Sequence, residues 1–559
     1  FVADTCDIVV IGGGPGGSAV ATFLSDAGYA VTIVERERFP REHVGESLLP
    51  ASIPILEQLG VMPEVEAAGF VVKHGATLVW GSDPDPWSWY FSDDPGQRPT
   101  SFQVVRSEFD NILLKNAATH GVDVRENAQV LDVLFDEGRA SGVRFLQDGT
   151  ESEITSRFVV DASGQAAILS RKLGLLEWDT HFNNLAVYGY FKGGSHLESP
   201  NDGNIFIEAF EHGWLWKIPL HTGVDSVGAV VDKDIGHDRL RELGPEGFLQ
   251  AQINEAPHVK EMLSNASFVG EPKVVRDWSY KSSAFSGDGY ILVGDAACFV
   301  DPLFSSGVHL ALGSASLAST YVQTVLTDPS ASETAAATYR DIYEKQYQYF
   351  HLTAQLFYGT NRASDSYFWE ARRILGDDSK TPREAFVKVV GGQPPQGYER
   401  AVIERGEIPG GILDDVSRME AHLKEQTAAT ERLTENNGED LLNGIPVLPR
   451  HIRLEQKPIL SGTEYKQTFH LVVDSDKNLA HGYPLSPVMA GLIAKMDGSK
   501  TMSAVISEFE AEHGVAQPGA IRSLILKDLP PIITIGMLDV TPPGKTRAER
   551  RRFERLARK

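Results

Sequence analysis

The sequence predicts an α/β fold in which a nucleotide-binding sheet is interrupted by a second, mostly antiparallel sheet. The first observation is the apolar run at residues 7–11, which leads directly into a glycine-rich segment at residues 12–17. The second is a stretch at residues 186–231 in which strand-like segments follow one another with few helix signals. The third is a later apolar run at residues 291–293, followed at once by a Gly-Asp pair. This order predicts a first domain that the chain leaves and later rejoins.

The N-terminal segment has the pattern of a Rossmann-type unit. Residues 7–11 are typical of a parallel strand covered on both faces, and the alanine-rich residues 18–27 predict a helix. Gly28 supplies a C-cap for that helix, and residues 30–34 predict a second strand that ends at Glu35. A strand, a tight turn, a helix and a second strand with an acidic residue at its end form a dinucleotide-binding unit.

The glycine segment has the spacing GxGxxG, and each glycine has a physical role. Gly12 makes the turn, Gly14 lets the backbone approach a pyrophosphate, and Gly17 lets the helix pack on the sheet. The N-terminus of the helix attracts the anion, and the acidic residue that ends the second strand can hold ribose hydroxyls. We assign the cofactor site to Gly12, Gly14, Gly17, Glu35 and Arg36.

Further signals place other elements and the domain boundaries. Residues 104–121 predict a helix, and helices at 487–496, 501–513 and 518–528, followed by a strand at 532–535, are similar to a winged-helix unit. The predicted domains are a nucleotide-binding domain (1–180 and 281–330), an inserted β-sheet substrate domain (181–280), a helical extension and linker (331–450), a winged-helix-like domain (451–545) and a basic tail (546–559).

Composition and charge exclude several classes of protein. The chain has 559 residues, of which 42% are hydrophobic and 23% charged, so wholesale disorder is excluded. A net charge of −24 makes nucleic-acid binding unfavourable, although residues 545–559 carry eight basic side chains against two acidic ones. Cys6 and Cys298 are too few for a disulfide framework or a four-cysteine zinc site, and no apolar run has the length of a membrane span. We expect a cytoplasmic protein with no signal peptide, no metal and no integral membrane segment.

Later motifs indicate which dinucleotide is bound. Arg106, followed by Phe109 and Asp110, and then the Gly-Asp-Ala-Ala run at residues 294–297 resemble later FAD contacts of the glutathione-reductase-type flavin monooxygenases. In that family the aspartate of the Gly-Asp pair binds the ribityl chain, which implies this role for Asp295. The resemblance therefore implies that the cofactor is FAD and that Arg106 contributes to its site.

The sequence Trp-Leu-Trp-Lys-Ile-Pro that begins at Trp214 is similar to a signature of the flavin-dependent halogenases. On a strand, Trp214 and Trp216 point to the same face, so both indoles form one wall. The resemblance implies that this wall keeps the substrate away from the flavin. Residues 39–50 and 299–309 also resemble the halogenases, in particular the bacterial branch that includes the chloramphenicol, pyoluteorin and chondrochloren halogenases. The resemblance extends over about residues 7–369.

The halogenase resemblance implies roles for further residues. Lys73 matches the position of the family's active-site lysine, which holds hypochlorous acid through its ammonium or carries the chlorine as a chloramine. Backbone amides around Ser306 and Gly307 would hold chloride beside the flavin. Asp277 matches a segment near the flavin in the chloramphenicol branch, where an aspartyl link to the cofactor can form; an ordinary hydrogen-bonding aspartate is the alternative. Ser47 is included among the cofactor-binding residues.

The resemblance implies an FADH2-dependent halogenase. Oxygen and chloride would give hypochlorous acid, which would pass Trp214 and Trp216 to Lys73 and chlorinate an electron-rich phenolic or pyrrolic natural-product precursor. The branch also implies a substrate tethered to an acyl or peptidyl carrier protein, for which the basic tail is a docking arm. Because the sequence has no second GxGxxG segment for a nicotinamide cofactor, we expect a separate NAD(P)H-dependent flavin reductase to supply FADH2.

Four other functions are compatible with parts of the sequence. An FAD-dependent aromatic monooxygenase would share the glycine segment and Asp295 but would not need Trp214 or Lys73. A flavin reductase acting on isoprenoid double bonds shares the Asp-Ala-Ser-Gly motif at residues 161–164. A halogenase of an aliphatic enolate-type acyl thioester and a non-catalytic carrier-docking protein are the other two.

Overall fold

The computed structural model describes two groups of residues. The first group is 4–80, 85–93 and 98–359, and the second is 430, 432–435, 437–449, 452–461, 464–473, 483–513, 519–534 and 537–541. The chain divides into two compact units, residues 1–396 with 462–465 and residues 397–461 with 466–559. The predicted basic tail at 546–559 and part of the predicted linker, residues 360–429, lie outside the described residues. The predicted domain boundaries stay predictions.

A mixed sheet with a parallel centre forms one layer of the first unit. Its strands in spatial order are β16 (Ser286–Gly287), β17 (Tyr290–Leu292), β10 (Thr150–Asp161), β1 (Asp4–Ile11), β2 (Val31–Val34) and β7 (Asp123–Arg125), and β8 (Ala128–Asp136) and β9 (Arg139–Gln147) extend β10 in antiparallel fashion. The central strands are buried apolar runs, as a sheet covered on both faces requires. β17 pairs in parallel with β10, so the predicted return of the chain to its first sheet is confirmed.

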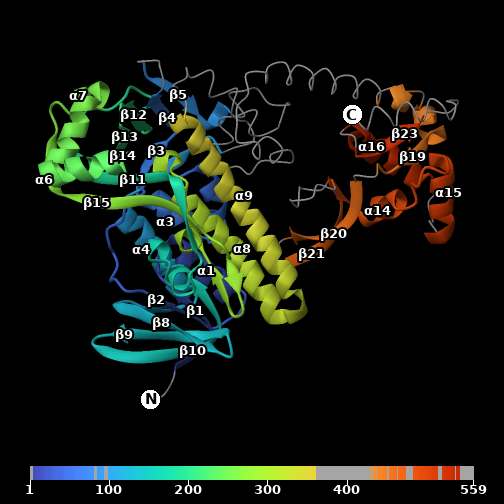
Figure 1. Cartoon of the computed structure of the whole chain (residues 1–559), viewed down its shortest axis with the longest axis horizontal. Coiled ribbons are helices and arrows are strands. Elements are labelled where there is room, and N and C mark those ends of the chain that lie inside the picture. The colour runs from blue at the N-terminus through green and yellow to red at the C-terminus, as the bar shows by residue number, and fades with distance from the viewer. Residues whose placement is uncertain are drawn as a thin grey trace. The chain divides into compact units, whose positions relative to one another are not determined.

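Helices pack on this sheet and on one another. They are α1 (Pro15–Asp26), α2 (Ile53–Gln58), α3 (Met62–Ala67), α4 (Arg106–Thr119), α5 (Ile168–Lys172), α8 (Gly307–Thr327) and α9 (Ser332–Gly359). α1 packs against α4 and α8, and α9 runs beside α8 (Figure 1). Pro15 begins α1 at a position where a helix has no use for the missing N–H. The helix predicted at residues 104–121 is α4.

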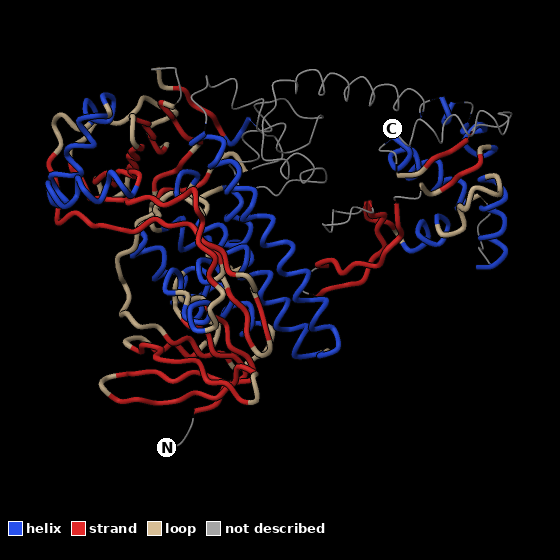
Figure 2. Tube along the Cα trace, in the orientation of Figure 1, coloured by secondary structure: helices blue, strands red, loops and turns tan. Residues whose placement is uncertain are grey.

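A second sheet is mostly antiparallel, and its strands are among those drawn in red in Figure 2. Its strands in spatial order are β18 (Cys298–Phe299), β15 (Ser267–Ser282), β11 (Leu176–Lys192), β14 (Val224–Asp232), β13 (Gly213–Pro219), β12 (Ile205–Phe210), β4 (Gly75–Val79) and β5 (Trp87–Tyr90). The predicted run of strands is confirmed, but β4 and β5 come from an earlier part of the chain that the sequence did not place in this sheet. β4 joins it by pairing in parallel with β12.

The two faces of the second sheet have different neighbours. One face packs on α6 (Lys233–Glu255) and α7 (Pro257–Met262) through an apolar core that includes Leu215. The opposite face carries Trp214 and Trp216, because side chains alternate along a strand. The two-stranded ribbon of β3 (Val71–Lys73) and β6 (Ser101–Gln103) pairs Lys73 with Ser101.

The second unit contains both helices and strands around its own apolar core. Its strands are β19 (Ile445–Val447), β20 (Ile452–Ser461), β21 (Glu464–Val473), β22 (Tyr483–Leu485) and β23 (Asp539–Thr541), and its helices are α14 (Pro487–Ile493), α15 (Met502–His513) and α16 (Ala520–Thr534). β21 belongs to this unit from Lys466 onward. The three predicted helices are confirmed. A winged-helix arrangement stays a prediction.

The strand predicted at residues 532–535 was wrong, because α16 continues to Thr534. Ile525, Leu529 and Ile532 are all fully buried, and their spacing of four and three residues places them on one helical face. The adjacent isoleucines near the end of α16 therefore continue a helical stripe, although their β-branched side chains suggested a strand. Among the described residues, no helix has both the length and the apolar character needed to cross a membrane.

Candidate active site

A cavity of about 670 Å³, the large cavity, lies at the carboxyl ends of the parallel strands. Gly12 lines it after β1, Glu35 after β2, Ser163 after β10 and Val293 after β17. Residues of β11, β13 and β18 in the second sheet also line it. Ligands of open α/β sheets bind at this edge of the strands, so the topology marks the large cavity as the site.

The glycine segment shapes the end of the large cavity next to α1. Gly12 has a φ of +97°, and a Cβ there would lie 2.6 Å from the carbonyl oxygen of Ala162. A Cβ on Gly17 would lie 2.0 Å from the carbonyl oxygen of Gly12, so this close approach of α1 to the turn requires glycine. Gly12 and Gly14 line the cavity and Gly17 supports the turn, whereas contact with a pyrophosphate stays a prediction.

Glu35 is held at the rim by two backbone groups. Its Oε2 accepts a hydrogen bond from the Gly13 N–H at 2.6 Å, and its Oε1 accepts one from the Glu37 N–H at 2.8 Å. Arg36 lines the cavity beside it, with a mostly exposed side chain. Both predicted residues therefore lie at the rim of the large cavity, and their contact with a ribose stays a prediction.

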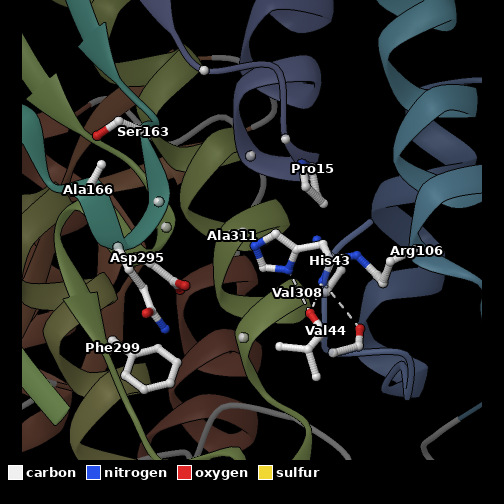
Figure 3. A pocket seen from close by; sticks show the side chains of 18 of the residues that line it. Pro15, His43, Val44, Arg106, Ser163, Ala166, Asp295, Phe299, Val308 and Ala311 are labelled. Carbon is white, nitrogen blue, oxygen red and sulfur yellow. Dashed lines mark hydrogen bonds between the residues drawn. The ribbon is translucent and has the colours of Figure 1, made fainter. Parts of the chain in front are cut away.

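Two guanidinium groups share one buried carboxylate near the glycine segment. Asp110 accepts hydrogen bonds from Arg106 Nε at 2.8 Å and Nη2 at 2.9 Å, and Arg41 Nη1 lies 3.1 Å from its Oδ2. Arg106 also donates to the Val44 carbonyl at 2.7 Å (Figure 3). Arg41 Nη2 lies 3.4 Å from the place a Gly14 Cβ would occupy. Because two positive groups face one negative group, the cluster keeps a positive charge suited to a pyrophosphate.

Asp295 lies across the large cavity from this cluster. Figure 3 shows Asp295 and Phe299 on one side and His43, Val44 and Arg106 on the other. Burial raises the pKa of Asp295 to about 7, although the Arg106 guanidinium acts to lower it. A half-buried carboxyl group can accept hydrogen bonds from hydroxyls and, when protonated, donate one. Asp295 therefore fits the predicted contact with the hydroxyls of a ribityl chain.

The two predicted tryptophans form one wall of the large cavity. The rings of Trp214 and Trp216 are buried, both line the cavity, and their centroids lie 5.9 Å apart. Trp216 Nε1 donates to Ser226 Oγ at 3.2 Å. Trp214 Nε1 donates to the Tyr358 hydroxyl at 2.5 Å, which in turn donates to Asp301 at 2.8 Å. The last turn of α9 is thereby tied to the indole wall.

Lys73 is buried at the end of β3, with only 2% of its surface exposed. Its Nζ donates hydrogen bonds to Ser47 Oγ at 2.7 Å and to the Leu48 carbonyl at 3.3 Å, and lies 5.4 Å from the centre of the Phe91 ring. Burial lowers the pKa of Lys73 to about 7. At neutral pH the amine is therefore divided between its charged and its neutral form.

Lys73 lines a second, much smaller cavity of about 10 Å³, the lysine cavity. The other lining residues are mostly apolar, namely Leu49, Ala76, Leu78, Trp89, Ile205, Ile207, Leu303, Phe304 and Ser305. Ile205 and Ser305 line both cavities, and Ser47 lines the large cavity while it contacts Lys73. The lysine cavity is thus separated from the large cavity by a wall one residue thick.

Ser306 and Gly307 line the large cavity at the start of α8. Ser305, just before them, has a φ of +57°, a left-handed conformation that turns the chain into the helix. The first N–H groups of a helix have no acceptor within the helix and carry its positive end. Ser306 and Gly307 therefore lie beside the large cavity, and chloride binding by their amides stays a prediction.

Asp277 belongs to β15, where its backbone pairs with Asn184 of β11. Its side chain lies outside the described residues. The predicted aspartyl link to the cofactor stays a prediction.

The large cavity fits a flavin dinucleotide. The glycine turn and the surplus positive charge at Arg41 and Arg106 suit the pyrophosphate, and Glu35 and Asp295 suit two sets of hydroxyls. The sequence matches the tryptophan halogenase family over residues 7–99 and 94–407, which is well over half of the chain. The chain belongs to the tryptophan halogenase family. It is a flavin-dependent halogenase whose cofactor is FAD, as the motifs predicted.

Individual halogenases resemble the chain over most of this region. A tryptophan 2-halogenase of Chondromyces crocatus is 34% identical over 66% of this chain and 71% of its own. A 1H-pyrrole-2-carbonyl-[peptidyl-carrier protein] chlorinase of Pseudomonas fluorescens is 33% identical over 64% of this chain and 84% of its own. The structure of the myxobacterial chondrochloren halogenase, an FAD-dependent enzyme, is 41% identical, with a TM-score of 0.62 over 72% of this chain and 92% of that one.

Sequence reasoning missed several residues of the halogenase site. Arg41 lies in a segment that resembled the halogenases. Its pairing with Asp110 brings the loop after β2 against α4, and no local sequence pattern predicts this contact. Trp80 and Tyr358 extend the indole wall, and the Trp80 ring is tilted against that of Trp214 with 6.5 Å between the ring centroids. The only sequence signal for these two was their aromatic character, which is equally typical of an ordinary core.

Proposed function

We propose that this halogenase chlorinates an electron-rich phenolic or pyrrolic carbon of a natural-product precursor. Reduced FAD, when bound in the large cavity, supplies the chemistry that turns oxygen and chloride into hypochlorous acid. The observation that carries the proposal is Lys73, a buried amine with a lowered pKa that lies in its own apolar cavity behind a thin wall. A hydroxylase would have no use for an amine at this place.

Lys73 controls a reagent that would otherwise attack any exposed nucleophile. In its charged form the ammonium donates a hydrogen bond to hypochlorous acid. In its neutral form the amine attacks chlorine: an N–Cl bond forms, the O–Cl bond breaks, and hydroxide leaves as water with a proton from the amine. Either form then presents chlorine to carbon inside a cavity whose other walls are mostly apolar.

The elements around the large cavity have two further roles in this proposal. Chloride binds at the start of α8, where the N–H groups of Ser306 and Gly307 and the positive helix end favour an anion. The indoles of Trp214 and Trp216 occupy the face of the second sheet that the substrate would need to reach the flavin. They exclude the aromatic substrate, which directs the reaction to Lys73 instead of to hydroxylation.

The substrate is proposed to arrive on a carrier protein. The support is the pyrrolyl-carrier chlorinase among the relatives, together with a lysine cavity that offers little to bind the charged groups of a free amino acid. The basic tail at residues 545–559 is then a docking arm for an acidic carrier. A separate NAD(P)H-dependent reductase is proposed to supply FADH2, so the purified halogenase should not oxidise NADH rapidly by itself.

Product analysis with Lys73→Met tests the proposal. With FADH2 regeneration, oxygen, chloride and a panel of free and carrier-tethered phenols and pyrroles, we expect chlorinated product from the wild type and none from Lys73→Met. Lys172→Met, which removes a half-exposed lysine paired with Asp132, is the matched control and should retain chlorination. Mass spectrometry distinguishes the outcomes. Oxygenated product that is independent of chloride and of Lys73 would identify a hydroxylase instead.

A further inference from the structure

The chain at residues 46–48 passes between the two cavities. Ser47 lines the large cavity, is 3% exposed, and places its Oγ 2.7 Å from Lys73 Nζ. Its backbone is fixed on both sides, because the Leu48 N–H donates to the Phe102 carbonyl at 2.9 Å and the Val104 N–H donates to the Glu46 carbonyl at 2.7 Å. The Ser47 hydroxyl therefore has a set position in the wall.

The hydrogen bonds of Lys73 leave one direction open. A lysine ammonium has three N–H donors. Within the described part of the chain, Nζ makes two hydrogen bonds, to Ser47 Oγ and to the Leu48 carbonyl. The pairing of Lys73 with Ser101 fixes the backbone from which the side chain extends. The charged amine has a third N–H left, and the neutral amine has a lone pair. The two acceptors fix the orientation of the amine, and so they fix the direction in which this N–H or lone pair points.

We propose that Ser47 is a positioning residue that aims the reactive N–H or lone pair of Lys73 into the lysine cavity. This inference rests on the proposed function of Lys73. Ser47 accepts from Lys73, so its own O–H is available to the large cavity that it lines. One side chain thus contacts the lysine and also lines the large cavity. Ser47 thereby serves Lys73 as well as the cofactor site to which the sequence assigned it.

Ser47→Ala removes this acceptor without adding volume. The charged amine loses more than the neutral amine when an acceptor is removed, so the pKa of Lys73 falls by about one unit. An amine held by one acceptor also turns more freely, and we expect chlorinated product per oxygen consumed to fall by about tenfold, with more hypochlorous acid released to the solution. Ser47→Thr keeps the hydroxyl and should restore both quantities towards the wild-type values.

The control is Ser101→Ala, which makes the same change at another buried serine. Ser101 faces Lys73 across the β3–β6 ribbon but makes no hydrogen bond with its amine. The Lys73 titration is measured on the FAD-bound protein with ¹³C-labelled lysine, its signal being assigned by its loss in Lys73→Met. Released hypochlorous acid is measured with monochlorodimedone, and FAD affinity is measured for each variant.

The outcomes separate the two proposals. A lower Lys73 pKa and a lower product yield in Ser47→Ala, with neither change in Ser101→Ala, support the positioning role. A Lys73 titration and product yield in Ser47→Ala equal to those of the wild type overturn it, even if FAD binds more weakly. If Lys73→Met retains full chlorination, the proposed function of Lys73 fails, whereas the titration still reports whether Ser47 holds the amine.

Discussion

The large cavity and the lysine cavity differ in volume, in lining and in the way the sequence forms them. The large cavity measures about 670 Å³ and is lined by charged side chains that include Glu35, Arg41 and Arg106. The lysine cavity measures about 10 Å³ and is lined mostly by apolar groups around one amine. The lining of the first suits a charged cofactor, whereas the lining of the second leaves one amine among apolar side chains. Two variants and a pH titration test this contrast.

The largest expected effect comes from breaking the charge cluster of the large cavity. Asp110→Asn removes the carboxylate that Arg41 and Arg106 share, and leaves two largely buried guanidinium groups without the ion pair that joins them. We expect a loss of about 3–5 kcal/mol in the free energy of unfolding, measured by chemical denaturation. Asp123→Asn, at an exposed pair with Arg125, is the control and should lose about 0–1 kcal/mol. Equal losses in the two variants would contradict a structural role for the cluster.

Burial of Lys73 in the lysine cavity should make the free energy of unfolding depend on pH. Burial lowers the pKa of Lys73 from 10.5 to about 7 in the folded state. Between these values the unfolded chain binds one more proton, so the stability of the wild type rises with pH, by up to about 1.4 kcal/mol per unit. Below about pH 7 both states carry the proton, and this contribution no longer changes.

Lys73→Met provides the reference for this titration, because methionine cannot bind the proton. The difference in unfolding free energy between the two proteins should therefore change with pH above about 7 and level off below it. Chemical denaturation at several pH values gives the two curves. Parallel curves across this range would show that Lys73 is not held in a low-dielectric cavity.

The smallest effect concerns the indole wall. Ser226→Ala removes the acceptor of the Trp216 N–H, which is buried, and should cost about 1–3 kcal/mol of unfolding free energy. Trp216→Phe in the same background removes the unpaired donor and should recover part of that loss. A double-mutant cycle measures the coupling between the two residues. Additive losses would show that the hydrogen bond does not hold the ring.

The sequence predicted the large cavity better than the lysine cavity for a physical reason. The glycine turn, Glu35 and the alternation of Trp214 and Trp216 are local patterns, and local geometry fixes what each residue does. The parallel pairing of β4 with β12 depends on contacts between segments more than a hundred residues apart, and no periodicity in either strand reveals it. The position of Lys73 followed only from a resemblance to known enzymes.

Two other cases show where local patterns fail. Asp110 was noticed as part of a motif, but its contact with Arg41 depends on how α4 packs beside the glycine turn. In α16, Ile532 and its neighbour are β-branched, which suggested a strand. Ile525 and Leu529 are buried on the same helical face as Ile532, and the helix continues through this segment to Thr534. Packing against a core overrode intrinsic preference there.

The small volume of the lysine cavity has a consequence for how tightly a substrate can bind. A space of about 10 Å³ holds about one water molecule and no aromatic ring. If the substrate reaches Lys73 in this cavity, as we propose, its aromatic ring fits only when side chains such as Leu49 or Phe304 have moved aside. Its apparent affinity is then reduced in proportion to the fraction of protein molecules in that open state. Trimming Phe304 to alanine would raise that fraction. A weak measured affinity would then reflect the rarity of the open form and not a poor fit between substrate and enzyme.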